Sequence, residues 1–253
     1  MSSQHSILEI EHLSLSTRQN KTLVDDVSLA VKPGESIGLV GESGSGKTMT
    51  LRCMIGLLPS GIIQTGGNIK SSGNCAMIFQ NPIEALDPLC PVVRQLAEVI
   101  YYRQKVNRND SYKLALELLE RLGLPDSLKQ KDRYPRELSG GQCQRIVIAI
   151  ALACKPDILL CDEPTTALDV TVQKQIMETI KDLQGKLGFA MVFVTHNLAI
   201  ASSICSRLFV MKEGRIIESG ETLNLLKNPQ NAYTQMLIRS VLPLPEVERR
   251  ETL

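Results

Sequence analysis

The eight residues from 41 to 48 form the most specific chemical pattern in this chain. They read GESGSGKT and match the pattern G-x-x-x-x-G-K-[ST]. The preceding apolar run, SIGLV, is typical of a buried strand, and apolar residues at helical spacing follow the loop. A glycine-rich loop in this setting can direct its N–H groups at phosphate oxygens, and the helix N-terminus adds partial positive charge. The pattern predicts phosphate binding by Gly41, Glu42, Ser43, Gly44, Ser45, Gly46, Lys47 and Thr48.

Charged and metal-binding groups accompany this loop. Lys47 is predicted to reach the β and γ phosphates of a nucleotide, and the Thr48 hydroxyl is predicted to bind Mg²⁺. The segment DILLCDEP, residues 157–164, is an apolar strand that runs into two carboxylates. Beside a phosphate loop, Asp162 would lie near the metal and Glu163 would polarise a water molecule against the γ-phosphate. Adjacent acids are common in loops, so this interpretation depends on the phosphate loop.

A second segment of small residues, LSGGQCQR, spans residues 138–145. A serine and two glycines at the start of a helix can form another anion site, although a monomer offers it no second phosphate. In isolation the segment is also typical of an N-capped helix that follows a flexible turn.

Together these segments resemble the motifs of ATP-binding cassette (ABC) ATPases, and LSGGQCQR is similar to the signature motif of that family. The resemblance covers about residues 7–240. It implies a head-to-tail dimer with two ATP molecules at the interface, each closed over by the signature motif of the opposite subunit. The residues implied for that contact are Ser139, Gly140, Gly141 and Gln142.

The resemblance extends to three single residues. Gln80 in MIFQNP matches the Q-loop glutamine, which touches metal or water and links nucleotide state to the helical lobe. Asp169 in TTALD matches the D-loop, and His196 in FVTHN matches the histidine that contacts the γ-phosphate. The implied catalytic residues are Glu163 and His196, and the implied Mg²⁺ ligands are Thr48, Gln80 and Asp162. The other two histidines, His5 and His12, match no motif.

The elements that must position these residues follow from the hydrophobic pattern. Two alternating stretches, residues 6–16 and 24–35, predict strands, and a helix is predicted from Thr48 until Pro59 and Gly61 end it. Further helices are predicted at 92–104, 110–125, 145–154 and 171–188, and further strands at 157–162 and 190–196. Strands that alternate with helices indicate a parallel sheet covered on both faces.

The expected fold class is α/β, a P-loop NTPase of the ABC type with a mixed central sheet, a small antiparallel β lobe and an α-helical signature subdomain. Residues 1–84 and 136–240 would form the ATPase core with the β lobe. A helical insertion would span residues 85–135, ending next to the signature motif at 138–142, and residues 241–253 would be a tail. One ABC domain would thus cover about residues 7–240, with no internal repeat.

Finer resemblance indicates importers of peptides and nickel. The segment FQNPIEALDPLCPVV is similar to the region after the Q-loop in that group, and it implies that Leu86 and Pro88 lie near a docked membrane subunit. NPQNAYTQMLIRSVLPLP resembles the C-terminal motif of the group, with Asn231 and Ala232 in place of the usual His-Pro. Peptide-importing relatives often carry a cysteine cluster near the C-terminus, but no cysteine follows Cys205 here. This absence favours nickel as substrate.

Two differences from the family pattern concern the part of the site that would bind the adenine base. Family members often place an aromatic residue between the first two strands to stack on the base, whereas LSTRQNKTLVDD has none, and Arg18 or Thr17 falls near that position. The segment before Gln80 also looks short, so a hairpin of the small lobe is expected to be trimmed. Both departures predict modest affinity or base selectivity.

The composition of the chain limits the other classes of protein to which it could belong. The chain has 253 residues, and its 28 Lys and Arg against 27 Asp and Glu give no electrostatic case for nucleic-acid binding. Its seven cysteines include no C-x-x-C pair and are interpreted as reduced, buried small hydrophobes. No leader peptide or membrane span is expected.

The predicted function is that of an ATPase subunit of an ABC importer, with ATP and Mg²⁺ as cofactors. Nickel or a nickel chelate is placed ahead of di- and oligopeptides as the substrate, and a soluble ABC ATPase outside transport is the third alternative. The implied partners are a paralogous ATPase subunit, two membrane permease subunits and an extracytoplasmic substrate-binding protein, with no nucleic acid. The chain would lie on the cytoplasmic face of the inner membrane as a peripheral subunit.

Overall fold

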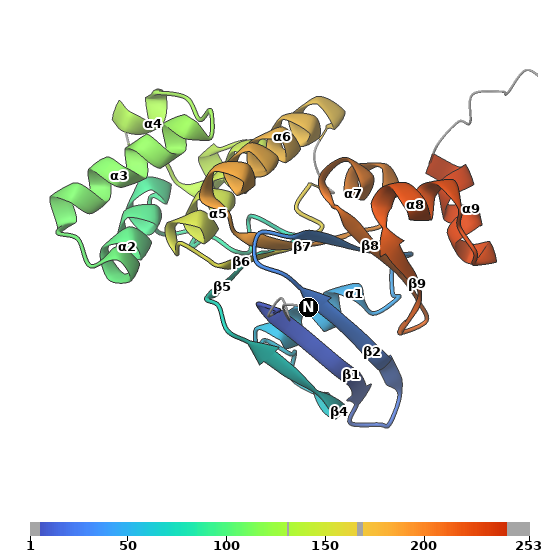
Figure 1. Ribbon diagram of the computed structural model, residues 1–253. Coiled ribbons are helices and arrows are strands. Elements are labelled where there is room, and N and C mark those ends of the chain that lie inside the picture. The colour runs from blue at the N-terminus through green and yellow to red at the C-terminus, as the bar shows by residue number, and fades with distance from the viewer. Residues whose placement is uncertain (1–5, 131, 166–168, 242–253) are drawn as a thin grey trace, which may run out of the picture.

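The computed structural model describes residues 6–130, 132–165 and 169–241. His5, most of the predicted tail at 241–253 and residues 166–168 of the predicted D-loop lie outside the described residues. Within these ranges the strands form a three-stranded sheet in the order β2-β1-β4 and a six-stranded sheet in the order β5-β6-β7-β3-β8-β9 (Figure 1).

The small sheet is antiparallel and is built by β1 (Leu8–Thr17), β2 (Thr22–Val31) and β4 (Ile62–Ser71). In β1, buried Leu8 and Ile10 alternate with more exposed residues, as expected for a strand with one face on the core. This face packs with α1 (Lys47–Met54) on one side of the central sheet, where Leu51 and Met54 join the same hydrophobic cluster.

The central sheet is parallel except at one edge. Five parallel strands are β5 (Cys75–Ile78), β6 (Ile158–Asp162), β7 (Ala190–Thr195), β3 (Ser36–Val40) and β8 (Arg207–Lys212). The antiparallel edge strand is β9 (Arg215–Glu221). Leu159 of β6 faces the helices on one side, while Leu160 faces the small sheet on the other. Burial on both faces explains why these strands are apolar runs without alternation.

Helices cover the other face and one end of the molecule (Figure 1). Those between Gln80 and the signature motif are α2 (Val92–Gln104), α3 (Arg108–Arg121) and α4 (Ser127–Gln130), which fall within the range expected for the helical insertion. The others are α5 (Gly140–Ala153), α6 (Val170–Leu187), α7 (Leu198–Ile204), α8 (Thr222–Lys227) and α9 (Ala232–Val241). A short 3₁₀ turn, Pro135–Glu137, precedes α5.

The helix after the phosphate loop is shorter than the sequence predicts. It ends at Met54, whereas the apolar spacing predicted a helix until Pro59. Gly56 has φ of 70°, its N–H donates to Cys53 O at 3.1 Å, and Leu57 N–H donates to Arg52 O at 2.9 Å. This pair of bonds closes the helix in a Schellman motif, so Gly56 ends it before the prolines are reached.

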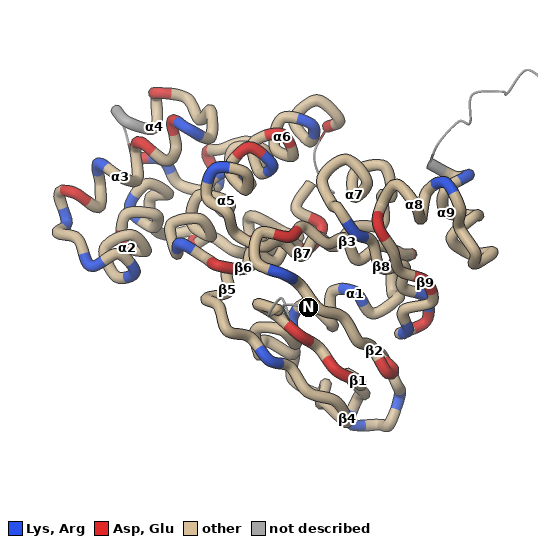
Figure 2. The backbone as a smooth tube through the Cα atoms, viewed as in Figure 1, with Lys and Arg blue, Asp and Glu red and all other residues tan. Residues whose placement is uncertain are grey.

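The burial of the cysteines and the positions of the charged residues can be compared with what the sequence predicts. All seven cysteines are free thiols, but only Cys53, Cys143, Cys161 and Cys205 are buried, while Cys75, Cys90 and Cys154 are half-buried. Figure 2 shows basic and acidic residues interspersed along the described chain. The net charge of +1 therefore reflects local mixing of both signs.

Candidate functional site

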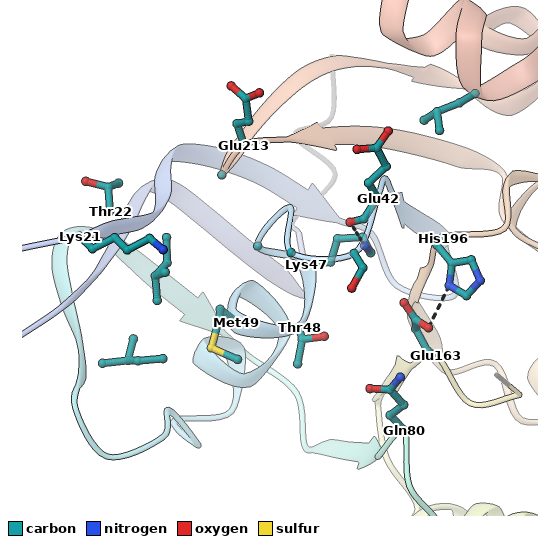
Figure 3. A pocket seen from close by; sticks show the side chains of 17 residues that line it. Lys21, Thr22, Glu42, Lys47, Thr48, Met49, Gln80, Glu163, His196 and Glu213 are labelled. Atoms are coloured by element: carbon teal, nitrogen blue, oxygen red, sulfur yellow. Dashed lines mark hydrogen bonds and ion pairs between the residues drawn. The ribbon is translucent and has the colours of Figure 1, made fainter. Parts of the chain in front are cut away.

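A cavity of about 990 Å³ opens above the phosphate loop and the N-terminus of α1 (Figure 3). It gathers residues from eight separate stretches of the sequence, which the central sheet, the small sheet and α9 bring together. The lining residues are Lys21, Thr22, Leu23, Glu42, Ser43, Gly44, Gly46, Lys47, Thr48, Met49, Ile62, Gln80, Glu163, His196, Glu213, Gly214 and Leu237. Most of the predicted phosphate loop, together with Gln80, Glu163 and His196, is therefore assembled around one space.

Two glycines of the loop have no room for a side chain. A Cβ at Gly41 would lie 2.1 Å from the backbone oxygen of Met211, and a Cβ at Gly46 would lie 2.9 Å from that of Leu23. Gly46 also has φ of 101°, in a region that L side chains rarely adopt. The loop is thus pressed against β8 and β2, which fixes its path around the cavity.

The N-terminus of α1 points into this space. Gly46 is the N-cap and supplies no side chain to cap the first N–H groups of the helix. The first turn of a helix leaves four N–H groups without intrahelical acceptors, and together with the helix dipole they favour an anion. A phosphate group fits this cradle.

The Lys47 ammonium lies within the loop, held by two of its carbonyl groups. The ammonium donates to Gly41 O at 2.8 Å and to Glu42 O at 2.7 Å, and only 4% of the residue is exposed. Burial lowers the pKa of this ammonium, while the carboxylates of Glu163 and Asp162 act in the opposite direction. The two carbonyl groups offer the buried ammonium only partial negative charge. A bound phosphate would offer it a full negative charge and therefore a stronger pairing.

Asp162 and Thr48 form the candidate metal site. The Thr48 hydroxyl donates to Asp162 Oδ1 at 2.8 Å, while Asp162 Oδ2 is buried and has no hydrogen-bond partner. Burial raises the pKa of this carboxyl, and the bond from Thr48 partly offsets that effect. An orphaned carboxylate oxygen beside a hydroxyl fits Mg²⁺, which takes one or two protein oxygens and completes its shell with water and phosphate. The part of the chain that the structure describes holds no cluster of three His, Cys, Asp or Glu side chains able to bind a metal by themselves.

Glu163 and His196 meet at the end of the cavity away from Lys21 and Thr22 (Figure 3). His196 Nδ1 lies 3.0 Å from Glu163 Oε2, and the Glu163 side chain is only 12% exposed. Glu163 has φ of 44°, and its N–H donates to Val194 O of β7 at 3.0 Å. A left-handed conformation is costly for a glutamate, and such backbone outliers cluster at functional sites.

The outer end of the cavity differs from the sequence expectation. Neither Arg18 nor Thr17 lines it; Lys21, Thr22 and Ile62 do so instead. No Phe, Tyr or Trp is found among its described lining residues, in agreement with the missing aromatic. Sequence reasoning also missed Glu213 and Leu237, which no local pattern could reveal because they belong to distant C-terminal elements.

The signature residues do not line this cavity. Ser139 caps α5, since its hydroxyl accepts from Gln142 N at 3.3 Å and the Gln142 side chain accepts from Ser139 N at 3.0 Å. A Cβ at Gly141 would lie 2.9 Å from Val172 of α6, so the two helix starts pack closely. Asp169 likewise caps α6, accepting from Val172 N at 2.9 Å. Within one chain Ser139 and Asp169 act as helix caps, and neither lines the cavity.

A phosphate loop, a carboxylate pair at a strand end and a histidine around one cavity define a P-loop nucleotide hydrolase. The family model described as "ABC transporter" matches residues 24–166. The chain therefore belongs to the ABC transporter family as an ATP-binding subunit that couples ATP hydrolysis to transport. This confirms the resemblance drawn from the motifs.

Relatives named for peptide transport align over nearly the whole chain. A putative peptide import ATP-binding protein of Brucella abortus (strain 2308) is 40% identical over 277 residues, which cover 98% of this chain and 82% of that protein. A probable D,D-dipeptide transport ATP-binding protein of Escherichia coli (strain K12) is 37% identical over 254 residues, which cover 92% of this chain and 77% of that protein.

Solved structures confirm the fold class. The ATP-binding cassette MJ0796, in a dimeric post-hydrolysis state bound to ADP and Pi, superposes with a TM-score of 0.74 at 28% identity, covering 85% of this chain and 98% of that one. cbiO1 of Clostridium perfringens, part of an ABC transporter complex, gives a TM-score of 0.76 at 26% identity, covering 88% of this chain and 91% of that one.

Proposed function

We propose that this chain is the ATPase subunit of an ABC importer of peptides. The observation that carries the proposal is the alignment over 98% of the chain with a relative named as a peptide import protein. Neither of the two relatives described above is named for nickel, so the peptide alternative takes precedence over the nickel substrate expected from the sequence. Nickel, the substrate expected from the sequence, is the second candidate.

The chain's own residues have distinct roles in this proposal. Backbone N–H groups of residues 43–48 bind the phosphates of ATP, while Gly41 and Glu42 shape the start of the loop. Lys47 leaves the loop carbonyls to pair with phosphate oxygens. Thr48, Asp162 and Gln80 would hold Mg²⁺, which would neutralise charge on the phosphates. Glu163 accepts a proton from the attacking water, and His196 orients that carboxylate through the contact at 3.0 Å. His196 also lies on the cavity wall, where it can contact the γ-phosphate.

A second subunit completes the site. Ser139, Gly140, Gly141 and Gln142 would close over the ATP of the opposite subunit, and Asp169 would lie at the same interface. The solved dimer of a related cassette supports this arrangement. We propose a paralogous ATPase subunit as the partner. ATP-driven closure would then change access in two permease subunits, while residues 85–135 form the helical lobe that follows the nucleotide state.

Membrane association would come from the partners. Among the described residues, no helix is both long and apolar enough to cross a bilayer. The proposed place is the cytoplasmic face of the inner membrane, against the permeases, with an extracytoplasmic binding protein that delivers the substrate.

Uptake in cells tests the substrate. Labelled dipeptide and radioactive nickel are supplied to cells that lack the gene, and to the same cells carrying the wild type or Glu163→Gln. We expect dipeptide uptake to be lost on deletion and restored by the wild type alone. Loss of nickel uptake with unchanged dipeptide uptake would transfer the assignment to nickel, and loss of neither would refute an importer of these substrates.

A further inference from the structure

The C-terminal helix α9 reaches the phosphate loop. Tyr233 and Leu237 are four residues apart and thus share one face of this helix. Leu237 lines the cavity, and the Tyr233 hydroxyl accepts a hydrogen bond from the Glu42 N–H at 3.0 Å. This bond joins residues 191 positions apart in the sequence. A helix remote in the chain therefore touches the loop directly.

The bond acts on one particular peptide plane. The Glu42 N–H and the Gly41 carbonyl belong to the same planar unit, in which they point in opposite directions. Tyr233 holds the N–H end, while Lys47 Nζ donates to the carbonyl end at 2.8 Å. A rotation of this plane would break both bonds, so the tyrosine hydroxyl and the phosphate-binding lysine are coupled through one peptide.

The tyrosine is itself held in place. Its ring is buried, and Lys212 Nζ lies 5.0 Å from the ring centroid. Asn231 Oδ1 accepts from the Tyr233 N–H at 2.9 Å, so the residue that replaces the usual histidine of the related motif caps the start of α9. Glu218 of β9 accepts from Gln230 N at 2.7 Å and from Asn231 N at 3.1 Å, which ties this helix start to the sheet.

We propose that Tyr233 is a positioning residue that fixes the Gly41–Glu42 peptide and thereby prepares the phosphate loop for ATP. The inference rests on the nucleotide site proposed above and adds α9 to it. Without the hydroxyl, the Glu42 N–H loses its acceptor and the loop gains freedom that ATP binding must then remove. Tyr233 is not among the residues that line the cavity, so we expect its loss to change ATP binding and not the chemical step.

Hydrogen exchange of the full-length, nucleotide-free chain tests the contact. Tyr233→Phe removes one oxygen and keeps the ring. The matched control is Tyr102→Phe, which makes the same change at an exposed position of α2. We expect about one additional amide of the peptide covering residues 39–51 to exchange early in Tyr233→Phe alone. The peptide covering β7 should be unchanged, which excludes general unfolding. Unaltered exchange in residues 39–51 would overturn the proposal.

Steady-state ATP hydrolysis tests the consequence. We expect Tyr233→Phe to raise KM for ATP roughly 3- to 10-fold, the effect of one hydrogen bond, with kcat within about 2-fold of the wild type. Tyr102→Phe should leave both constants unchanged. An unaltered KM, or a loss confined to kcat, would contradict the positioning role. A wild type that hydrolyses no ATP even in the assembled complex would instead refute the proposed function, while the exchange comparison would still test the contact.

Discussion

Glu163 combines three features that suit a general base. Its side chain is 12% exposed, its backbone is in a left-handed conformation, and His196 Nδ1 lies 3.0 Å from its carboxylate. The histidine itself is half exposed on the cavity wall. A nearly buried carboxylate that is oriented by a partner can hold one water molecule in line with a bound phosphate.

Glu163→Gln tests this role. The amide keeps the shape of the side chain but accepts no proton from water, so we expect turnover to fall roughly 10²- to 10⁴-fold while ATP binding persists. Single-turnover hydrolysis and equilibrium binding of ATP measure the two effects. Glu178→Gln on the exposed face of α6 is the control and should retain full activity. Undiminished turnover in Glu163→Gln would refute the assignment.

The burial of Asp162 leads to a prediction on how the stability of the protein depends on pH. Because burial raises the pKa of its carboxyl, the folded protein binds more protons than the unfolded chain just above the ordinary pKa of aspartate. Its contribution to stability therefore decreases as pH rises through that range. Asp162→Asn removes the buried charge, so we expect its Tm without nucleotide to exceed that of the wild type at pH 8 by roughly 2–4 °C.

The pH dependence of that difference is the decisive observation. Melting curves measured between pH 5 and pH 8 should show the two proteins converge toward acid pH, where the wild-type carboxyl becomes protonated. Asp182→Asn, which removes an exposed carboxylate on α6, should show no such trend. A wild type that is more stable than Asp162→Asn at pH 8 would contradict the argument. The same variant should lose Mg²⁺-dependent ATP hydrolysis.

At the scale of elements, α5 and α3 each begin with a side chain that caps the helix. Comparing the two caps distinguishes the effect of losing a cap from the effect of losing a residue of the signature motif. Ser139 accepts from Gln142 N at the start of α5, and Asn107 accepts from Asp110 N at 2.9 Å at the start of α3. Both side chains satisfy one N–H of a first turn. Only Ser139 lies in the segment that resembles the family signature.

Ser139→Ala and Asn107→Ala should therefore lose similar stability but differ in activity. We expect each to lower the free energy of unfolding by about 0.5–2 kcal/mol, measured by urea denaturation. Only Ser139→Ala should also reduce ATP hydrolysis in the assembled complex. Equal activity of the two variants would mean that the serine is a helix cap and nothing more.

At the scale of the whole molecule, the segment between β5 and α2 carries apolar side chains that the fold leaves uncovered. Leu86, expected from the sequence near a docked membrane subunit, is only 3% exposed and packs in the core. The exposed large hydrophobic residues of this segment are Ile83, at 60%, and Leu89, at 86%. We propose that these two side chains, which follow Gln80 closely in the sequence, give a permease an apolar contact.

Charged substitutions test this docking surface, defined here as Ile83 and Leu89. The double change Ile83→Asp and Leu89→Asp should abolish co-purification with detergent-extracted permeases and leave ATP binding by the free subunit intact. Leu223→Asp on α8, a residue that is 73% exposed, is the control and should still co-purify. Retention of the double variant on the permeases would place the docking surface elsewhere.

The sequence by itself determined the local chemistry and the class of the protein. The loop of residues 41–48, the carboxylates after β6 and the apolar strand runs are written in contiguous residues, because a phosphate loop and a buried parallel strand each impose a local pattern. Of the described helices, α1, α2, α3, α5 and α6 were likewise predicted, whereas α4, α7, α8 and α9 were not. The end of α1 was also missed, since a single glycine closed it early.

Only the tertiary structure decided which distant residues share the cavity. Lys21, Ile62, Glu213 and Leu237 line it and Tyr233 bonds to the loop, although no periodicity marks any of them. Parallel strands bring Glu163, His196 and Glu213 to one edge of the central sheet, and the small sheet and α9 bring the other residues to the same place. Side-chain burial was decided in the same way, because Leu86 and Leu89 are alike in sequence and differ only in what packs against them.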